Sequence, residues 1–522
     1  MSTNQPSKSN TDDIIVSIRE SGIKLFHDQH KEAYIAIDGT SKNVLAIQSK
    51  EFKQWVGQYA YNSLARTLNI RAIEKIVTTL SGIALFDGVM IELNVRCVSK
   101  NSLIWYDLGS SAVAVGPGTW SVFDDPGIMF RRFQHQKAQV RPIESENVDL
   151  LRDYINIEDD NDWLLFVVAL IAAFIPGFPH PLLILHGPQG SGKTTPLEML
   201  KEIIDPSLLR GLPPPKNQEE FVHIATKHYF FFYDNLSFMP TWLSDALARA
   251  CTGDGFSKRA LYTNDDDVIY TFQRSIAING IPQVVTKSDL LDRAIPICLS
   301  RISDSQRQPY SDLWVAFEHD KPAILGSIFT ILAKAIEAHS SVALGKLPRM
   351  ADFYRWGCAI TVAMGIPKER FMHAYQINVS NQHSEAVEAS PVAQAVVKLL
   401  EHRDSWEGTA TELLQELNNL TGSSLNARSM GLPKQPNWLG RTLVQLQPDL
   451  QAHGIDIEID RSARPRKITI KKHTQNTVDA DVSSLFRTVK GAFGPIKILD
   501  NAVDPFADRQ HDSTDSKKLK LP

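Results

Sequence analysis

The chain has 522 residues, more than a single hydrophobic core usually organises, so several domains are expected. Its content of 43% hydrophobic and 22% charged residues is typical of a globular protein. The formal charge of −4 excludes a chain-wide excess of positive charge, so any contact with nucleic acid must come from local basic patches.

The cysteines and the apolar segments indicate whether disulfides, a zinc site or a membrane span are to be expected. The four cysteines are far apart and form no CxxC pair, which argues against a disulfide framework or a zinc site. The polar N-terminus predicts no signal peptide. The most apolar stretch, residues 163–175, has 13 residues, whereas a membrane span needs about 20. We therefore expect a cytoplasmic protein with no membrane association and a buried helix in this stretch.

The first 150 residues predict a short tail and one domain. Residues 1–13 are polar and are expected to be disordered, and residues 14–150 predict an α+β domain. Residues 34–37 and 103–108 have the aromatic and branched content of strands, and residues 63–82 have apolar side chains at helical spacing. No catalytic constellation is recognisable in this domain.

Residues 151–305 predict an α/β core with a parallel sheet. After the buried helix, a strand at residues 182–185 runs directly into a glycine-rich segment, and residues 195–204 predict the next helix. Strands and helices then alternate, as in a parallel sheet with helical crossovers. Residues 306–388 predict a helical subdomain.

The glycine-rich segment, residues 187–194 (here the glycine loop), predicts a P-loop that binds ATP and Mg²⁺. A phosphate chain needs inward-pointing N–H groups, which glycines allow, a lysine for the β and γ oxygens, and a hydroxyl for magnesium. The residues assigned to nucleotide binding are Gly187, Pro188, Gln189, Gly190, Ser191, Gly192, Lys193, Thr194 and Thr195.

Three further residues suit such a site. Asp234 ends a hydrophobic strand about forty residues after Lys193 and is the predicted magnesium ligand, although it could merely cap a turn. Asn279 ends another buried strand and could orient water near the γ-phosphate; the alternative is a turn-forming residue before Gly280. Arg293 could neutralise charge in phosphoryl transfer, although a surface salt bridge is an equal alternative on the residues alone.

Residues 389–473 predict a winged-helix-like DNA-binding domain. Helical segments near residues 392–400, 410–417 and 438–446 precede two β runs, at 455–459 and 468–470. The turn and its flanks are basic and could contact phosphates, with a solvated charged turn as the alternative. The residues assigned to DNA contact here are Arg461, Arg464, Arg466 and Lys467. Residues 474–522 predict a largely disordered tail.

The ordered motifs of the core resemble those of a superfamily-3 helicase of the AAA+ class, of the phage and mobile-element primase-helicase type. The match covers roughly residues 180–302, and the order of TGDGFSKR and ING is its most specific part. The segments that carry it are GPQGSGKT at 187–194, FFFYDN at 230–235, WLSD at 242–245, TGDGFSKR at 252–259, ING at 278–280 and LDR at 291–293.

The resemblance implies an ATP-driven DNA helicase or translocase in replication of a phage, prophage or mobile element. It implies a homo-hexameric ring in which Lys193, Thr194 and Asp234 act from one subunit and Arg293 from the next. It also implies a hairpin facing DNA, where Lys258 and Arg259 at its base are candidate contacts and a solvated face is equally expected. Since about 150 residues precede the core and carry no primase-like carboxylate cluster, any priming is expected from a separate primase.

Two other functions remain open at this point. One is an AAA+ ATPase that loads or remodels proteins on DNA without unwinding it. The other is a small-molecule kinase, because such enzymes share the P-loop. The arginine after the Asn279 strand, the long helical region and the basic hairpin of the C-terminal module count against a kinase.

Overall fold

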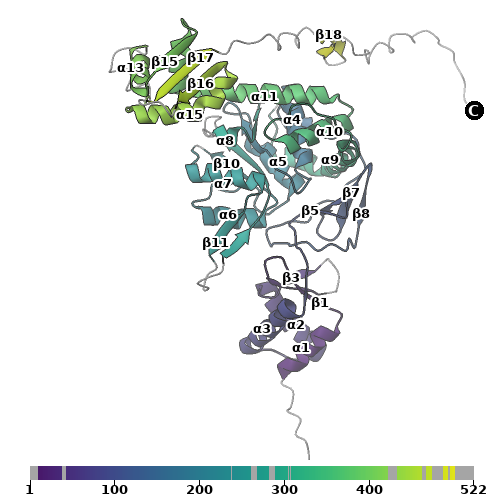
Figure 1. Cartoon of the computed structure of the whole chain (residues 1–522). Coiled ribbons are helices and arrows are strands. Elements are labelled where there is room, and N and C mark those ends of the chain that lie inside the picture. The colour runs from purple at the N-terminus through teal and green to yellow at the C-terminus, as the bar shows by residue number, and fades with distance from the viewer. Residues whose placement is uncertain are drawn as a thin grey trace, which may run out of the picture. The chain divides into compact units, whose positions relative to one another are not determined.

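The computed structural model describes most of the chain, and it divides into two compact units, residues 1–389 and 390–522 (Figure 1). Each unit is described by itself. The described residues are 10–37, 43–236, 238–259, 267–280, 288–303, 305, 307–420, 432–460, 466–472, 486–491 and 494–499.

The first unit begins with three helices beside a four-stranded sheet of order β3-β2-β1-β4. Helix α1 starts at Asn10, so the expectation of disorder over residues 1–13 was wrong for its last four residues. The helix expected at 63–82 is confirmed from Ile70 onward, but its start was wrong, because Ala65 ends one helix in a left-handed conformation (φ 50°) and Asn69 caps the next. The elements are α1 (Asn10–Glu20), β1 (Lys24–His27), β2 (Ala33–Ala36), β3 (Val44–Ala46), α2 (Lys50–Leu64), α3 (Ile70–Phe86) and β4 (Val89–Met90).

A second sheet follows, so the region expected to form one α+β domain contains two separate sheets. It is an antiparallel meander of β5 (Cys97–Lys100), β6 (Leu103–Asp107), β7 (Ala112–Gly116) and β8 (Thr119–Phe123). Its inner face shares a hydrophobic core with later helices. The ring of Tyr106, for example, lies 5.2 Å from that of Phe174 and 5.5 Å from that of Phe329.

The central sheet has the order β10-β13-β9-β14 and is entirely parallel, which confirms the predicted α/β architecture. Successive side chains of its strands enter two different cores. Leu183 and Phe232 pack on one side of the sheet, and Ile184 and Tyr233 pack on the other. The strands are β9 (Leu182–His186), β10 (Phe230–Leu236), β13 (Ser275–Gly280) and β14 (Ala294–Cys298).

Helices surround this sheet and complete the first unit. The apolar stretch around residue 168 forms a buried helix, as expected, and the segment after residue 309 is helical. Among the described residues, no helix combines the length and apolarity needed to cross a membrane. The helices are η1 (Val148–Asp153), α4 (Asp160–Ala172), α5 (Thr194–Ile204), α6 (Gln218–Lys227), α7 (Thr241–Thr252), α8 (Ser288–Leu291), α9 (Tyr310–His339), α10 (Ala351–Ala363) and α11 (Lys368–Ala389).

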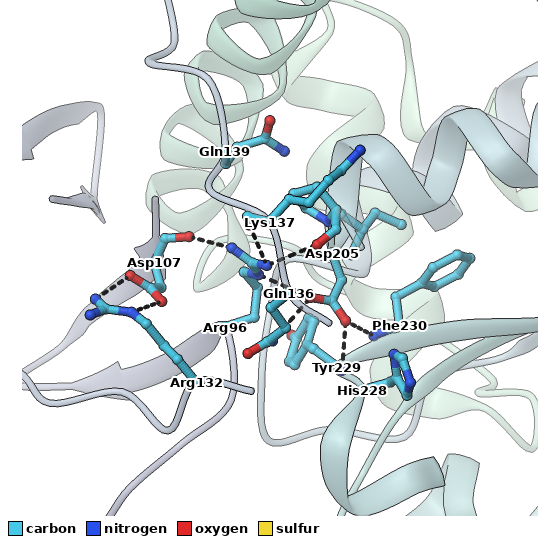
Figure 2. Close-up of polar contacts among 12 residues, drawn as sticks. Arg96, Asp107, Arg132, Gln136, Lys137, Gln139, Asp205, His228, Tyr229 and Phe230 are labelled. Carbon is cyan, nitrogen blue, oxygen red and sulfur yellow. Dashed lines mark hydrogen bonds and ion pairs between the residues drawn. The ribbon is translucent and has the colours of Figure 1, made fainter. Parts of the chain in front are cut away.

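A buried charge cluster joins the end of α5 to the meander sheet and to the start of β10 (Figure 2). Asp205, fully buried, accepts hydrogen bonds from Arg96 Nε at 3.0 Å, from Lys201 Nζ at 2.9 Å and from the backbone N–H of Tyr229 at 2.9 Å. Burial opposes ionisation, yet Lys201 and Arg96 together hold the pKa of Asp205 well below its usual range. The end of α5 is therefore fixed by charged groups that all have partners.

The second unit contains a small α/β module and a hairpin. Its three-stranded antiparallel sheet has the order β15-β17-β16. A hairpin of β18 and β19 lies within the tail that was expected to be largely disordered, so these two strands are an exception to that expectation. The elements are α12 (Pro391–Leu400), β15 (Ser405–Gly408), α13 (Ala410–Leu420), α15 (Pro436–Ala452), β16 (Ile455–Asp460), β17 (Lys467–Lys472), β18 (Phe486–Gly491) and β19 (Gly494–Leu499).

Candidate functional site

The candidate site lies at the carboxyl edge of the central parallel sheet. The glycine loop follows β9, Asp234 lies near the end of β10, and Asn279 lies near the end of β13. Because β13 sits between β9 and β10, Asn279 lies between the loop and Asp234. Carboxyl ends of parallel strands are where ligands commonly bind in open α/β sheets.

The glycine loop needs its glycines for conformation and for space. Gly187, Gly190 and Gly192 have φ values of 154°, 84° and 69°, which other residues rarely adopt. A Cβ on Gly187 would lie 2.4 Å from the carbonyl oxygen of Leu299, so a side chain there would displace the backbone. Helix α5 begins at Thr194, and its first N–H groups have no partners within the helix, as at any helix start.

Lys193 is held by its own loop. Its Nζ donates to the carbonyl oxygens of Gly187 and Pro188, both at 3.0 Å. Burial, with the nearby positive charge of Lys193, lowers the pKa of His186 below its ordinary value, which keeps that imidazole neutral. Ser191 is buried, whereas Pro188 and Gln189 are exposed at the turn of the loop.

Three polar side chains meet beside the loop. Thr194 Oγ1 donates to Asp234 Oδ1 at 3.0 Å, and Asn279 Nδ2 donates to the same oxygen at 2.5 Å. The structure therefore brings together Thr194, Asp234 and Asn279, next to Lys193, although they come from three separate segments. Sequence analysis had assigned all four to one site.

The donor set suits magnesium. Within the described part of the chain, no three His, Cys, Asp and Glu side chains are grouped to hold a metal ion. Mg²⁺ does not need such a cage, because it usually keeps several waters and binds through one or two carboxylates plus substrate phosphates. The hydroxyl of Thr194 and the carboxylate of Asp234 provide that kind of partial ligand set.

The amide of Asn279 is oriented by a partner that sequence analysis missed. The backbone N–H of Asn235, a residue with φ 56°, donates to Asn279 Oδ1. This bond directs Nδ2 of Asn279 toward Asp234. No pattern in the sequence signals it, because it depends on the left-handed backbone of Asn235 and on the neighbouring position of the two strands.

A second segment that sequence analysis missed lies on the glycine loop. Leu299 N donates to the carbonyl oxygen of His186 at 2.8 Å, and Ile302 N donates to that of Gly190 at 3.4 Å. A Cβ on Gly192 would be 3.0 Å from the Ile302 side chain. The residues that follow β14 thus pack against the loop and restrict its movement.

Arg293 lies away from these residues. Its carbonyl oxygen accepts a hydrogen bond from Leu182 N at 2.8 Å, which places it beside the amino end of β9, whereas the glycine loop follows the carboxyl end. Its Nη1 donates to the backbone oxygen of Asp289 at 2.6 Å and forms an ion pair with the Asp289 carboxylate at 2.5 Å. The structure therefore does not bring Arg293 to the Lys193 site of the same chain.

The residues expected to contact DNA are only partly described. Lys258 and Arg259 lie in β11 (Phe256–Arg259), which pairs with β12 (Asp267–Tyr270), but their side chains are outside the description, as are Arg461 and Arg464. Arg466 is exposed just before β17.

The basic residues of β17 lie beside acidic residues of the neighbouring segments. Lys467 forms an ion pair with Glu407, and Lys472 Nζ lies 3.9 Å from an oxygen of Asp404. Asp460 stands opposite Lys467 in the strand register, and Asp456 stands opposite Lys471. The basic residues of β17 are thus balanced by acids on both neighbouring strands, which sequence analysis had not related to them.

Helix α15 carries an exposed aromatic surface that sequence analysis did not single out. The side chain of Trp438 is 62% exposed at the start of the helix. It borders an open hollow of about 370 Å³ that Pro433, Lys434, Gln435 and Thr442 also line. Arg441 is exposed one turn further along the same helix. A solvent-exposed tryptophan beside cationic side chains can stack on a nucleic-acid base.

Two family models match consecutive parts of the chain. Residues 148–382 match the model described as actinomycete integrative conjugative element replication protein. Residues 392–484 match the model described as AICE RepA C-terminal domain. These two consecutive matches support a replication protein of a mobile element, similar to those of actinomycete integrative conjugative elements. Among curated proteins, no sequence matches the chain.

Solved structures give weaker likenesses. The apo C-terminal region of NrS-1 is 11% identical, with 88% of this chain and 98% of that chain covered and a TM-score of 0.41. JCV helicase bound to a small molecule is 14% identical, with 42% of this chain and 65% of that chain covered and a TM-score of 0.24. At such TM-scores neither likeness carries a conclusion about function.

Proposed function

We propose that this replication protein is an ATP-dependent DNA helicase or translocase with a P-loop core of the AAA+, superfamily-3 type. The observation that carries the proposal is the meeting of Thr194, Asp234 and Asn279 next to Lys193 at the carboxyl edge of the sheet. A lysine, a hydroxyl, a carboxylate and an amide beside a glycine-rich turn are the groups that nucleoside triphosphate hydrolysis requires.

Each residue then has a chemical role. Bound ATP and Mg²⁺ would supply the transferable phosphoryl group and the divalent charge. The loop N–H groups and Lys193 hold the β and γ phosphates, with Lys193 leaving the carbonyls of Gly187 and Pro188 to do so. Thr194 and Asp234 hold the metal, and Asn279 orients a water through an amide that Asn235 N fixes.

The position of Arg293 supports a ring. Five strand residues separate it from the glycine loop, which corresponds to roughly 17 Å. An arginine side chain cannot span that distance back to its own site, so Arg293 reaches phosphate only in a neighbouring subunit. A head-to-tail arrangement of identical subunits that closes on itself provides such a junction, and a homo-hexamer is the form we propose.

The second unit supports a DNA contact. We propose that this unit is a winged helix in which α15 enters the groove, and the order α12, β15, α13, α15, β16, β17 supports this proposal. Trp438 and Arg441 are exposed on α15, whereas Lys467 forms an ion pair with Glu407. We therefore assign DNA contact in this unit to α15 more than to the β16–β17 hairpin.

The test is steady-state ATP hydrolysis with and without single-stranded DNA, for the full chain and for Lys193→Ala and Arg293→Ala. We expect DNA to stimulate hydrolysis, both variants to lose it, and a mixture of the two to recover part of it. Strand displacement of a forked duplex then distinguishes a helicase from an ATPase that loads or remodels proteins on DNA. Hydrolysis that ignores DNA and survives Arg293→Ala would contradict the proposal and favour a kinase.

A further inference from the structure

Arg349 links the edge that carries Arg293 to the helical part of the first unit. It lies just before α10, about sixty residues after α8. Its Nη1 donates to Asp292 Oδ2 at 2.7 Å, and its Nη2 donates to Asp289 Oδ1. One guanidinium group therefore holds two carboxylates, one within α8 and one directly after it, a geometry that a planar, multi-donor side chain can provide.

The carboxylate of Asp289 is shared by two arginines. Its Oδ1 is bound by Arg293 at 2.5 Å and by Arg349. The two arginines differ in accessibility, since the side chain of Arg293 is 18% exposed and that of Arg349 is 44% exposed. Although partial burial opposes it, the hydrogen bonds from Arg293 and Arg349 lower the pKa of Asp289, so this carboxylate stays ionised and binds both.

We propose that Arg349 is a positioning residue for Arg293, acting through the shared carboxylate of Asp289. This inference rests on the proposed function, in which Arg293 acts on the ATP of a neighbouring subunit. Arg293 must leave Asp289 to reach that phosphate. Arg349 then remains bonded to Asp289 and balances the negative charge of its carboxylate. Arg349 also holds Asp289 in place through Asp292, so the carboxylate does not follow Arg293 toward the subunit junction.

The first part of the test separates positioning from binding. Arg349→Ala should lower the maximal rate of ATP hydrolysis roughly tenfold while the dissociation constant of a fluorescent ATP analogue stays unchanged. Arg349→Lys should recover only part of the rate, because an ammonium cannot hold both carboxylates as a guanidinium does. Arg355→Ala, an exposed arginine on α10, is the matched control and should behave as the unaltered protein. Thermal unfolding verifies that each variant is folded.

The second part uses mixed subunits, since each proposed site takes Lys193 from one subunit and Arg293 from the next. An equal mixture of Arg349→Ala and Lys193→Ala should recover activity, because about a quarter of the junctions then combine two intact halves. A mixture of Arg349→Ala and Arg293→Ala should recover none, because both changes damage the same half.

The outcomes distinguish the inference from the function on which it rests. Recovery in the Arg349→Ala and Arg293→Ala mixture would mean that Arg349 serves its own subunit's site, which overturns the inference alone. If a mixture of Lys193→Ala and Arg293→Ala recovers no activity, the proposal of a site shared between subunits is wrong. The proposed role of Arg349 is then wrong as well. Weakened nucleotide binding by Arg349→Ala would likewise overturn a positioning role.

Discussion

Asn279 donates a hydrogen bond to Asp234, with 2.5 Å between Nδ2 and Oδ1, and its own Oδ1 accepts from Asn235 N. The amide is therefore fixed at both ends. We expect Asn279→Ala to lower the rate of ATP hydrolysis roughly a hundredfold, since an oriented polar group is lost, while nucleotide affinity changes little. Asn279→Asp should be at least as damaging, because a second carboxylate would repel Asp234. Turnover and nucleotide affinity, measured separately, test both expectations. An equal loss in affinity and rate would instead indicate a collapsed site.

Thr194 bonds to Asp234 at 3.0 Å and is expected to share magnesium with it. Thr194→Ala should raise the magnesium concentration needed for half-maximal hydrolysis, because a metal-binding hydroxyl is lost. Thr194→Ser keeps the hydroxyl and should behave nearly as the unaltered protein. Magnesium titrations of ATP hydrolysis provide the measurement. A Thr194→Ala variant with unchanged magnesium dependence would exclude the hydroxyl as a ligand.

Loss of different exposed side chains of the C-terminal unit should affect its affinity for single-stranded DNA unequally. Trp438→Ala and Arg441→Ala should each weaken binding of single-stranded DNA, with about 1–3 kcal/mol lost for a stacking tryptophan. Lys467→Ala should change this affinity little, because the ammonium of Lys467 already forms an ion pair with Glu407. Fluorescence anisotropy at two salt concentrations measures the affinities. A larger loss from Lys467→Ala than from Trp438→Ala would return DNA contact to the hairpin.

Acid should weaken the cluster at the end of α5. Burial, aided by the charge of Lys201, lowers the pKa of His228 to about 2, and burial lowers that of His135, whose ring is 4.1 Å away, to about 4. Folded-state pKa values below the unfolded value of about 6.5 give stability that is present above pH 6.5 and lost as pH falls. For His228 the loss between pH 7 and pH 5 is about 2 kcal/mol.

The measurement is thermal unfolding at both pH values. The full chain should melt at a lower temperature at pH 5, and His228→Gln, which keeps an acceptor for Lys201, should show a smaller decrease. The remaining decrease is expected from His135 and from His180, whose pKa burial lowers to about 3. An identical pH dependence in the variant would contradict the assignment.

Two helical glycines should respond to alanine in opposite directions. A Cβ on Gly326 in α9 would lie 1.6 Å from the carbonyl oxygen of Ile143, so Gly326→Ala should destabilise by about 2–3 kcal/mol. A Cβ on Gly57 in α2 would meet nothing within 4 Å, so Gly57→Ala should stabilise by about 0.5–1 kcal/mol. Urea unfolding of the two variants compares them directly, and equal shifts would contradict the packing at Ile143.

Local sequence signals were sufficient for the strand, glycine loop and helix around Lys193, because turn chemistry and hydrophobic periodicity are local properties. They also predicted a parallel sheet. They could not give the order of its strands, which places Asn279 beside Asp234, because lateral neighbours in a sheet are not encoded by spacing along the chain. The bond from Asn235 N depends on that order.

The features that sequence analysis missed also depend on contacts and conformations that are not local in the sequence. The helix expected over residues 63–82 begins too early, because Ala65, normally a good helix former, ends α2 in a left-handed conformation and α3 starts only at Ile70. The ion pair of Lys467 could not be predicted from local sequence, because its partner Glu407 lies sixty residues earlier. Clusters of like charge in a sequence indicate a basic surface only if the fold brings no acids to them.

Helix α5 begins at the glycine loop, and Asp205, which directly follows its last residue, is bonded into the meander sheet through Arg96. Its eleven residues form a rod about 16 Å long. Because the residue after α5 is bonded to Arg96, the helix is not free to move as an independent unit. The Arg96–Asp205 ion pair thus connects the far end of α5 to the residue that directly precedes β5, so we expect a movement of the glycine loop to reach the meander sheet through α5.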